Sequence, residues 1–147
     1  MKKFKFSLDS VLSYKEQCLE SLQNEHASIL AQQRTVEQRI REKEQAYYHF
    51  DDEYQQRCSQ GIAITDARFC ESQLRAMEND IKVEKKKLEE VQKQAEQKRL
   101  EVVSAKQDSA SIEKLKVKKE FAYRKAMAKD EEIFVEEFVS AAQVRNS

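Results

Sequence analysis

The side chains with the most reactive chemistry are three cysteines and two histidines, Cys18, Cys58, Cys70, His26 and His49. Cys58 and Cys70 lie on opposite sides of the hinge near Gly61, five and seven residues from residue 63, so a metal or disulfide site there is one interpretation. Structural zinc normally takes four ligands in tightly spaced pairs, which this spacing does not offer. We therefore expect ordinary thiols at a helix packing surface, no metal and no cofactor.

Catalytic, phosphate-binding and nucleic-acid sites are not expected either. A single glycine excludes glycine-rich phosphate loops, and His26 has no partner fixed near it by spacing, so a polar residue that sets helix register is favoured. Lysine runs at 85–87 and 114–119 interleave with glutamates, and 27 basic residues balance 27 acidic ones. We expect solvated helix faces, no nucleic-acid partner and no enzyme.

Gly61 is expected to divide the chain into two helices. The 147 residues hold no proline, one glycine and 37% charged residues, a composition typical of long helices. Glycine reaches the left-handed conformation that ends a helix, Thr65 can cap the second helix, and Ser7 can cap the first. A glycine inside one continuous helix is the alternative. We predict a single coiled-coil domain over 1–147, with helix 1 over about 7–60, a hinge at about 61–65 and helix 2 over about 66–145.

Apolar residues recur at alternating steps of four and three in both halves, over positions 8 to 54 and 70 to 112. This periodicity predicts an all-α fold, an antiparallel two-helix coiled coil. Beyond Ile112 the register changes, because Lys116 and Lys119 fall on the apolar seam.

The second helix is expected to extend past the first. Reflection about residue 63 places Phe4 opposite residue 122, so roughly the last 25 residues overhang the hairpin. This overhang carries an apolar face that includes Phe134 and Phe138, and such a face is usually buried against something. A partner protein is the expected occupant, and the alternatives are self-association and packing back on Phe4 and Phe6.

Four aromatic residues, Tyr47, Tyr48, Phe50 and Tyr54, lie close to the hinge. Coiled-coil seams prefer aliphatic residues, so these rings need an explanation. They either fill a wider gap where the helices diverge or form a docking surface for a partner, and both interpretations remain open.

The two ends of the chain resemble the flagellar export protein FliJ family. The opening motif is Phe4-Lys5-Phe6-Ser7-Leu8-Asp9-Ser10-Val11-Leu12, followed by Lys15-Glu16. The closing motifs are Glu113-Lys114-Leu115-Lys116-Val117-Lys118-Lys119-Glu120, Asp130-Glu131-Glu132, and Glu136-Glu137 before Phe138. Glu136 stands where the family pattern has aspartate, and the resemblance covers the whole length.

The resemblance implies a non-catalytic component of the flagellar type III export apparatus, similar to the central stalk of rotary ATPases. Its implied partners are the hexameric export ATPase, the cytoplasmic platform of the export gate, and export chaperones. The implied ATPase ring end carries Phe4, Phe6, Leu8, Phe134 and Phe138. The implied gate surface near the hinge carries Tyr47, Phe50, Tyr54, Gln73 and Met77.

No segment reaches 18 consecutive apolar residues, so we expect no membrane span and a cytoplasmic protein that associates peripherally with the membrane through the gate. The chain is expected to be monomeric alone. Two other functions fit the periodicity: a general coiled-coil chaperone that holds unfolded clients, and a structural zipper that dimerises in parallel.

Overall fold

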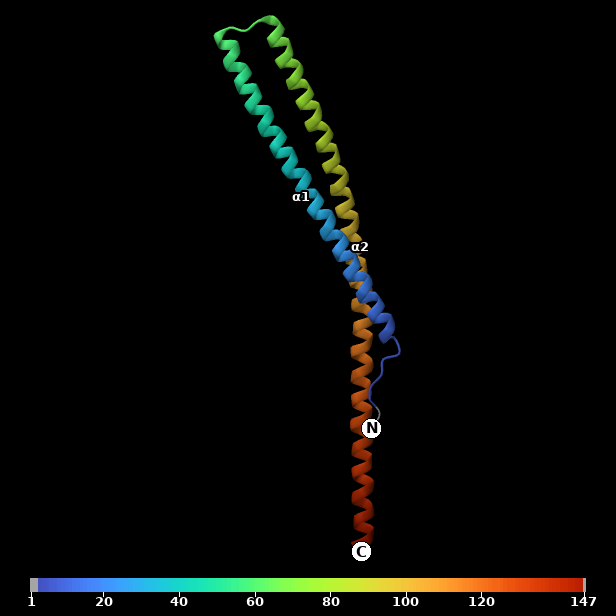
Figure 1. Ribbon diagram of the computed structural model, residues 1–147. Coiled ribbons are helices and arrows are strands. Elements are labelled where there is room, and N and C mark those ends of the chain that lie inside the picture. The colour runs from blue at the N-terminus through green and yellow to red at the C-terminus, as the bar shows by residue number, and fades with distance from the viewer. Residues whose placement is uncertain (1–2, 147) are drawn as a thin grey trace. The chain divides into compact units, whose positions relative to one another are not determined.

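The computed structural model describes residues 3–146, which form two helices joined by a short connection (Figure 1). Helix α1 spans Asp9–Gln60 and helix α2 spans Ile64–Asn146, and residues 3–146 contain no strand. The predicted all-α helical hairpin is therefore confirmed. The single domain predicted over 1–147 stays a prediction, and its residues 1, 2 and 147 lie outside the described part.

Gly61 ends α1 in the conformation that its sequence position suggested. Its φ angle is +96°, and its backbone N–H donates to the carbonyl oxygen of Cys58 at 3.3 Å. A Cβ built on Gly61 would meet nothing within 4 Å, so the backbone conformation rather than lack of space selects glycine here. The alternative of one continuous helix through Gly61 is wrong.

Both predicted helix caps are wrong by one or two positions. Helix α1 begins at Asp9, and the carbonyl of Leu8, not Ser7, accepts the first backbone hydrogen bond, from Leu12 at 2.8 Å. Only residues 61–63 are needed to reverse the chain, so α2 begins at Ile64 and Thr65 lies inside its first turn. An acidic residue nevertheless occupies the first turn of each helix, where its negative charge interacts favourably with the positive end of the helix dipole.

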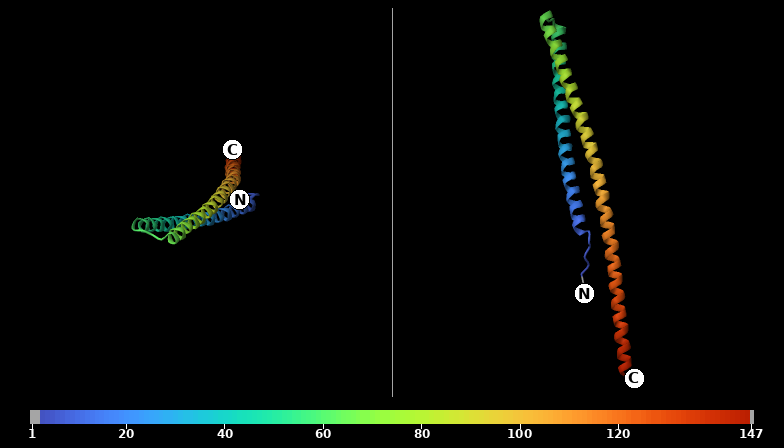
Figure 2. Two further views of the ribbon diagram at one scale, coloured as in Figure 1. Left: turned by 90° about the horizontal axis from the view of Figure 1, so that it is seen from above. Right: turned by 90° about the vertical axis from the view of Figure 1, so that its right-hand side faces the viewer.

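The chain contains two compact units, and the first comprises residues 22–102. Within it the two helices run antiparallel beside each other from the connection at 61–63, as the views of Figures 1 and 2 both show. The predicted seam positions of this unit are all buried or half-buried, with Val36, Ile40, Ile81 and Ala95 among the most protected. None of the described large side chains is completely buried, so the core is one layer of side chains thick.

The second unit comprises residues up to Ser21 together with those from Val103 onward. Phe6 and Leu12 are its buried apolar residues in the N-terminal part. The Lys116 ammonium contacts the Asp9 carboxylate at 3.0 Å, which fixes the first turn of α1 against α2. Lys116 is half-buried, Lys119 is exposed and Glu120 is half-buried, so the register change falls after Lys116 rather than directly after Ile112.

Candidate functional site

A buried carboxylate occupies a seam position in the unit of residues 22–102. Glu84 of α2 is only 4% exposed, and its two oxygens lie 3.2 Å from Arg39 Nη1 and 3.3 Å from Lys43 Nζ of α1. Lys87 Nζ lies 3.5 Å away on its own helix. Burial opposes ionisation of Glu84, but the hydrogen bonds from Lys43 and Arg39 outweigh it, so the pKa of Glu84 is lowered. The carboxylate is therefore charged and satisfied at neutral pH.

Several further ion pairs join the helices of this unit at the edges of the seam. Lys43 Nζ also contacts Asp80 at 2.9 Å, and this hydrogen bond is the main cause that raises the pKa of Lys43. Lys98 contacts Glu25 at 2.8 Å, and hydrogen bonds to Glu25 and Glu101 raise the pKa of Lys98. These pairs specify the antiparallel register, because a shift of either helix would separate them.

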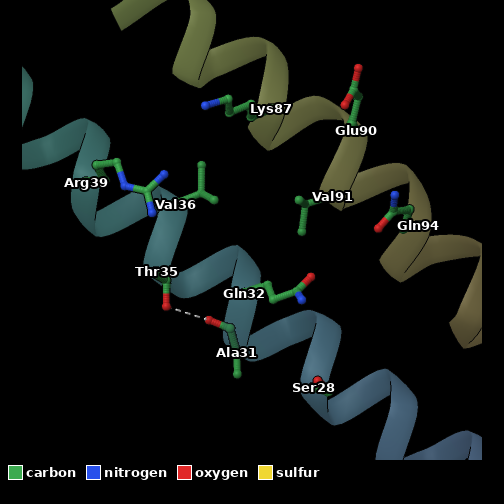
Figure 3. A pocket seen from close by; sticks show the side chains of 10 residues that line it. All are labelled: Ser28, Ala31, Gln32, Thr35, Val36, Arg39, Lys87, Glu90, Val91 and Gln94. Atoms are coloured by element: carbon green, nitrogen blue, oxygen red, sulfur yellow. Dashed lines mark hydrogen bonds between the residues drawn. The ribbon is translucent and has the colours of Figure 1, made fainter.

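A groove lined by both polar and apolar side chains lies between the helices beside the buried carboxylate (Figure 3). Its α1 side presents small side chains, and the Thr35 hydroxyl donates to the Ala31 carbonyl at 3.1 Å, which keeps that hydroxyl against its own helix. Arg39 and Lys87, both bonded to Glu84, close one end. The lining residues are Ser28, Ala31, Gln32, Thr35, Val36, Arg39, Lys87, Glu90, Val91 and Gln94.

The predicted gate surface lies near the helix connection, where three aromatic rings fill the space between the helices. Tyr47, Phe50 and Tyr54 are half-buried along one line of α1. The Tyr47 hydroxyl donates to Glu78 Oε1 at 2.7 Å and the Tyr54 hydroxyl donates to Glu71 Oε1 at 3.4 Å, both across to α2. On α2 itself, Met77 is half-buried and Gln73 is exposed. The rings therefore pack between helices and also keep part of their surface accessible.

The tyrosine hydroxyls in this region resist ionisation. The hydrogen bond to Glu78, followed by burial, raises the pKa of Tyr47 to about 12. A hydrogen bond with Cys58, followed by burial and the charge of Glu71, raises the pKa of Tyr54 to about 12. Both phenols remain donors throughout the physiological range.

The residues of the predicted ring end all lie in the second unit. Phe4 packs against Tyr123 of α2 with ring centroids 5.5 Å apart and planes inclined at 45°. Phe6 is buried, whereas Leu8 is exposed at the start of α1. Packing of the N-terminal segment on the tail, one of the predicted alternatives, therefore occurs for Phe4, and it involves Tyr123 rather than the last turns of α2.

Phe134 and Phe138 lie farther along α2 and are the most open part of the predicted ring end. They are 68% and 69% exposed. A shallow hollow lined by Met127, Asp130, Glu131, Phe134 and Val135 follows the same stretch. This stretch thus combines apolar side chains with acidic neighbours, which suits a protein partner better than a small molecule.

The thiols lie in three different environments and are all free. Cys18 is half-buried, Cys58 is exposed and Cys70 is buried. No group of three or more potential metal ligands occurs within residues 3–146. The alternating steps of four and three that start at position 70 pass through Glu84, but they gave no sign of the ion cluster around it. Reflection about residue 63 places Glu84 opposite position 42, and the basic residues Arg39 and Lys43, three residues and one residue from that position, could have indicated the cluster.

Sequence reasoning also missed a second apolar face of α2, which includes Val117, Phe121 and Val135 and lies on the side away from the seam. The signal was the step of four residues between Val117 and Phe121 outside the seam register. No helix within the described part of the chain is long and apolar enough to cross a membrane.

Comparison with protein-family models gives one assignment over nearly the full length. Residues 4–147 match the model described as Flagellar FliJ protein. Searches of curated proteins and of solved structures gave no significant match.

Proposed function

The chain belongs to the FliJ family and is thus a component of the flagellar protein export apparatus, and we propose that it is a non-catalytic, stalk-like regulator of the export ATPase. In this proposal it promotes assembly and activity of the hexameric ATPase ring and couples the ring to the export gate. It also escorts export chaperones. It works in the cytoplasm, at the membrane face of the flagellar base, through protein contacts.

The observation that best supports the proposal is the exposure of Phe134 and Phe138 at the end of α2. Two adjacent turns of a long helix do not normally keep phenylalanines in water unless another surface covers them. A ring of subunits with an apolar central opening is a suitable cover. Phe4, Phe6 and Leu8 would support the same contact from the N-terminal segment, with Phe4 already anchored on Tyr123.

The export gate is the proposed partner of the surface near the helix connection. Tyr47, Phe50, Tyr54 and Met77 are half-buried, and Gln73 adds an exposed amide beside them. Aromatic rings that are already fixed by hydrogen bonds lose little conformational freedom on binding, which favours them as contact residues. The Tyr47 and Tyr54 hydroxyls, bonded to Glu78 and Glu71 of α2, would keep the rings in place while their accessible edges contact the gate platform.

The test measures ATP turnover by the flagellar export ATPase with and without the full chain. The variant Phe134→Ala with Phe138→Ala should remove stimulation, and so should truncation after residue 122. The matched control is Tyr48→Ala with Phe69→Ala, which removes two aromatic side chains that are similarly exposed elsewhere.

The control should stimulate as the unchanged chain does. Binding without stimulation by the unchanged chain would overturn the regulatory role and favour an escort or general chaperone. Suppression of aggregation of arbitrary clients, in the absence of the ATPase, would identify the general chaperone. An equal loss in the control variant would show that the effect is not specific to the tail.

A further inference from the structure

A second exposed apolar stripe follows the outer face of α2, next to the side that carries Tyr123 and Met127. At about 100° per residue, Val117, Phe121, Val135 and Val139 lie within one narrow sector of the helix. Their side chains are between 48% and 67% exposed. Tyr123 and Met127, on the neighbouring side, are half-buried. The outer stripe borders the predicted ring contact, because Val135 also lines the hollow beside Phe134 and Ala128 lies at the edge of the hollow beside Phe4.

The outer stripe is symmetric about Ala128. Phe121 and Val135 lie seven residues before and after Ala128, and Val117 and Val139 lie eleven residues before and after it. A helix that pairs with an antiparallel copy of itself places such equidistant residues opposite each other. Ala128 would face its own copy at the two-fold axis, where its small side chain allows the helices to approach closely.

The charges on the same face are also complementary in this arrangement. The half before Ala128 is basic and includes Lys118, Arg124 and Lys125, whereas the half after it is acidic. Each of three acidic residues has a basic counterpart at nearly the same distance on the other side of Ala128. Arg124 and Glu131 lie four and three residues from Ala128, Lys125 and Glu132 lie three and four residues from it, and Lys118 and Glu136 lie ten and eight residues from it.

In an antiparallel pair, residues on the same flank of the two helices meet. Lys118 would therefore meet Glu136 of the second copy, Lys125 would meet Glu132, and Arg124 would meet Glu131. Arg124 is 3.0 Å from Glu120 in the single chain, an exposed contact that this pairing extends or replaces. Lys129, one residue from the proposed axis, would lie next to Lys129 of the second copy and has no acidic counterpart in this pairing.

From this symmetry we propose that the outer face of α2 between Val117 and Val139 is a self-association site that takes a second, antiparallel copy of this chain. The proposal differs from the monomer expected from the sequence, and it assigns to the outer face the self-association that the sequence left as an alternative for the tail. It does not depend on the proposed ATPase role, since it concerns a contact between two copies of this chain and not a contact with the ring.

Anionic lipid is the other ligand that a basic, apolar helix face attracts, and the acidic second half argues against it. A membrane surface would repel Glu131, Glu132 and Glu136, whereas a second copy uses them. The symmetric spacing of the apolar residues is also unnecessary for a membrane, which has no register.

Charge exchange tests the pairing with the full chain. Variant A carries Lys118→Glu and Lys125→Glu, and variant B carries Glu132→Lys and Glu136→Lys. Sedimentation equilibrium of the unchanged chain should show a reversible change from 17.3 kDa toward twice that mass as concentration rises. Each variant alone should dimerise at least about tenfold more weakly, because like charges then meet. An equimolar mixture of A and B should recover the dimer.

The matched control is Lys119→Glu, the same charge change on an exposed residue that lies away from the outer face. It should leave the dimerisation constant unchanged. A chain that stays monomeric at all concentrations would overturn the proposal, and so would a mixture of A and B that does not associate. If the unchanged chain and variant B sediment with phosphatidylserine vesicles, variant A does not, and none of them forms a dimer, the ligand of this face is lipid.

A disulfide at the proposed axis provides a second, independent measurement. In a background with Cys18→Ser, Cys58→Ser and Cys70→Ala, the variant Ala128→Cys should cross-link to its own copy in glutathione disulfide buffer. Ala126→Cys, two residues away and on the other side of the helix, is the control and should cross-link at least about tenfold more slowly. Equal rates would contradict the antiparallel register.

Discussion

The Glu84 carboxylate of α2 lies 3.3 Å from the Lys43 ammonium of α1, at a position where a coiled coil normally places an aliphatic side chain. Arg39 holds the other oxygen of the same carboxylate. A charge in this position specifies alignment at the expense of apolar contact, because only one register of the two helices satisfies it.

Two replacements of Glu84 should show whether its carboxylate serves to set the register of the two helices or to stabilise the folded chain. Glu84→Ala removes the shared partner of Arg39 and Lys43, and we expect the melting temperature to fall by about 5 °C. Glu84→Leu should melt at or above the temperature of the unchanged chain, because an aliphatic seam residue replaces a buried charge. Circular dichroism checks both, with Glu89→Ala, on the exposed face of α2, as control. Equal destabilisation by alanine and leucine would contradict a role in register.

Acid should remove the contribution of Glu84. The pKa of Glu84 is lowered in the folded chain, because the bonds from Lys43 and Arg39 outweigh the effect of burial. The stabilisation is therefore present above the ordinary glutamate pKa of about 4.3 and is lost as the pH falls through the lowered folded value. Melting temperatures of the unchanged chain and of Glu84→Gln should differ at pH 7 and converge in acid. A difference that persists at the lowest pH would contradict this assignment.

Substitution of Gly61 should destabilise the connection without a steric clash. At a φ of +96°, an alanine pays about 1 kcal/mol of backbone strain even though its Cβ has open space. Gly61→Asn should cost less, since asparagine tolerates the left-handed conformation better. Urea unfolding measures both variants. If both variants had the same free energy of unfolding as the unchanged chain, residue 61 would not need the positive φ angle described here.

Tyrosine titration should report the contacts across the hairpin. Because the folded pKa of Tyr47 is raised to about 12, its stabilising hydrogen bond persists below the ordinary tyrosine pKa of about 10 and is lost as the pH rises toward 12. Ultraviolet absorbance should show that Tyr47→Phe removes one group that ionises near 12. A titration in which Tyr47→Phe removes no group that ionises near 12 would contradict this contact.

Removal of the Tyr47 and Tyr54 rings should show whether they bind a partner or only fill the space between the helices. If the aromatic surface binds the export gate, Tyr47→Ala with Tyr54→Ala should weaken gate binding at least about tenfold while helicity is retained. If the rings only fill the gap, the same variant should lower the melting temperature and bind normally. Pull-down with the gate platform, combined with circular dichroism, distinguishes the two results.

The fold could be predicted from the sequence because its rules are local. One glycine in a chain without proline leaves one place to reverse direction, and steps of four and three residues define the seam. The pairs found in the structure follow the reflection about residue 63 closely: Tyr54 meets Glu71 and Phe4 meets Tyr123. Within each unit, the sequence pattern was thus sufficient to align the helices.

The features that the sequence did not predict correctly depend on contacts between residues that are far apart in the chain or in neighbouring turns. Ser7 and Thr65 are good capping residues, but the turn held by the Asp9 N–H and the Phe6 carbonyl at 3.1 Å, and the short connection after Gly61, set the helix starts elsewhere. The ion cluster of Glu84 requires side chains from both helices. The outer face of α2 was hidden because the search for apolar periodicity followed the seam.

The burial of Cys70 gives the chain a built-in chemical reporter. Cys70 is 3% exposed against α1, whereas Cys58, just before the connection, is exposed. A thiol reagent should modify Cys58 at once and Cys70 only when the helices separate locally. The ratio of the two reaction rates then measures how often that end of the hairpin opens, without any label added to the chain.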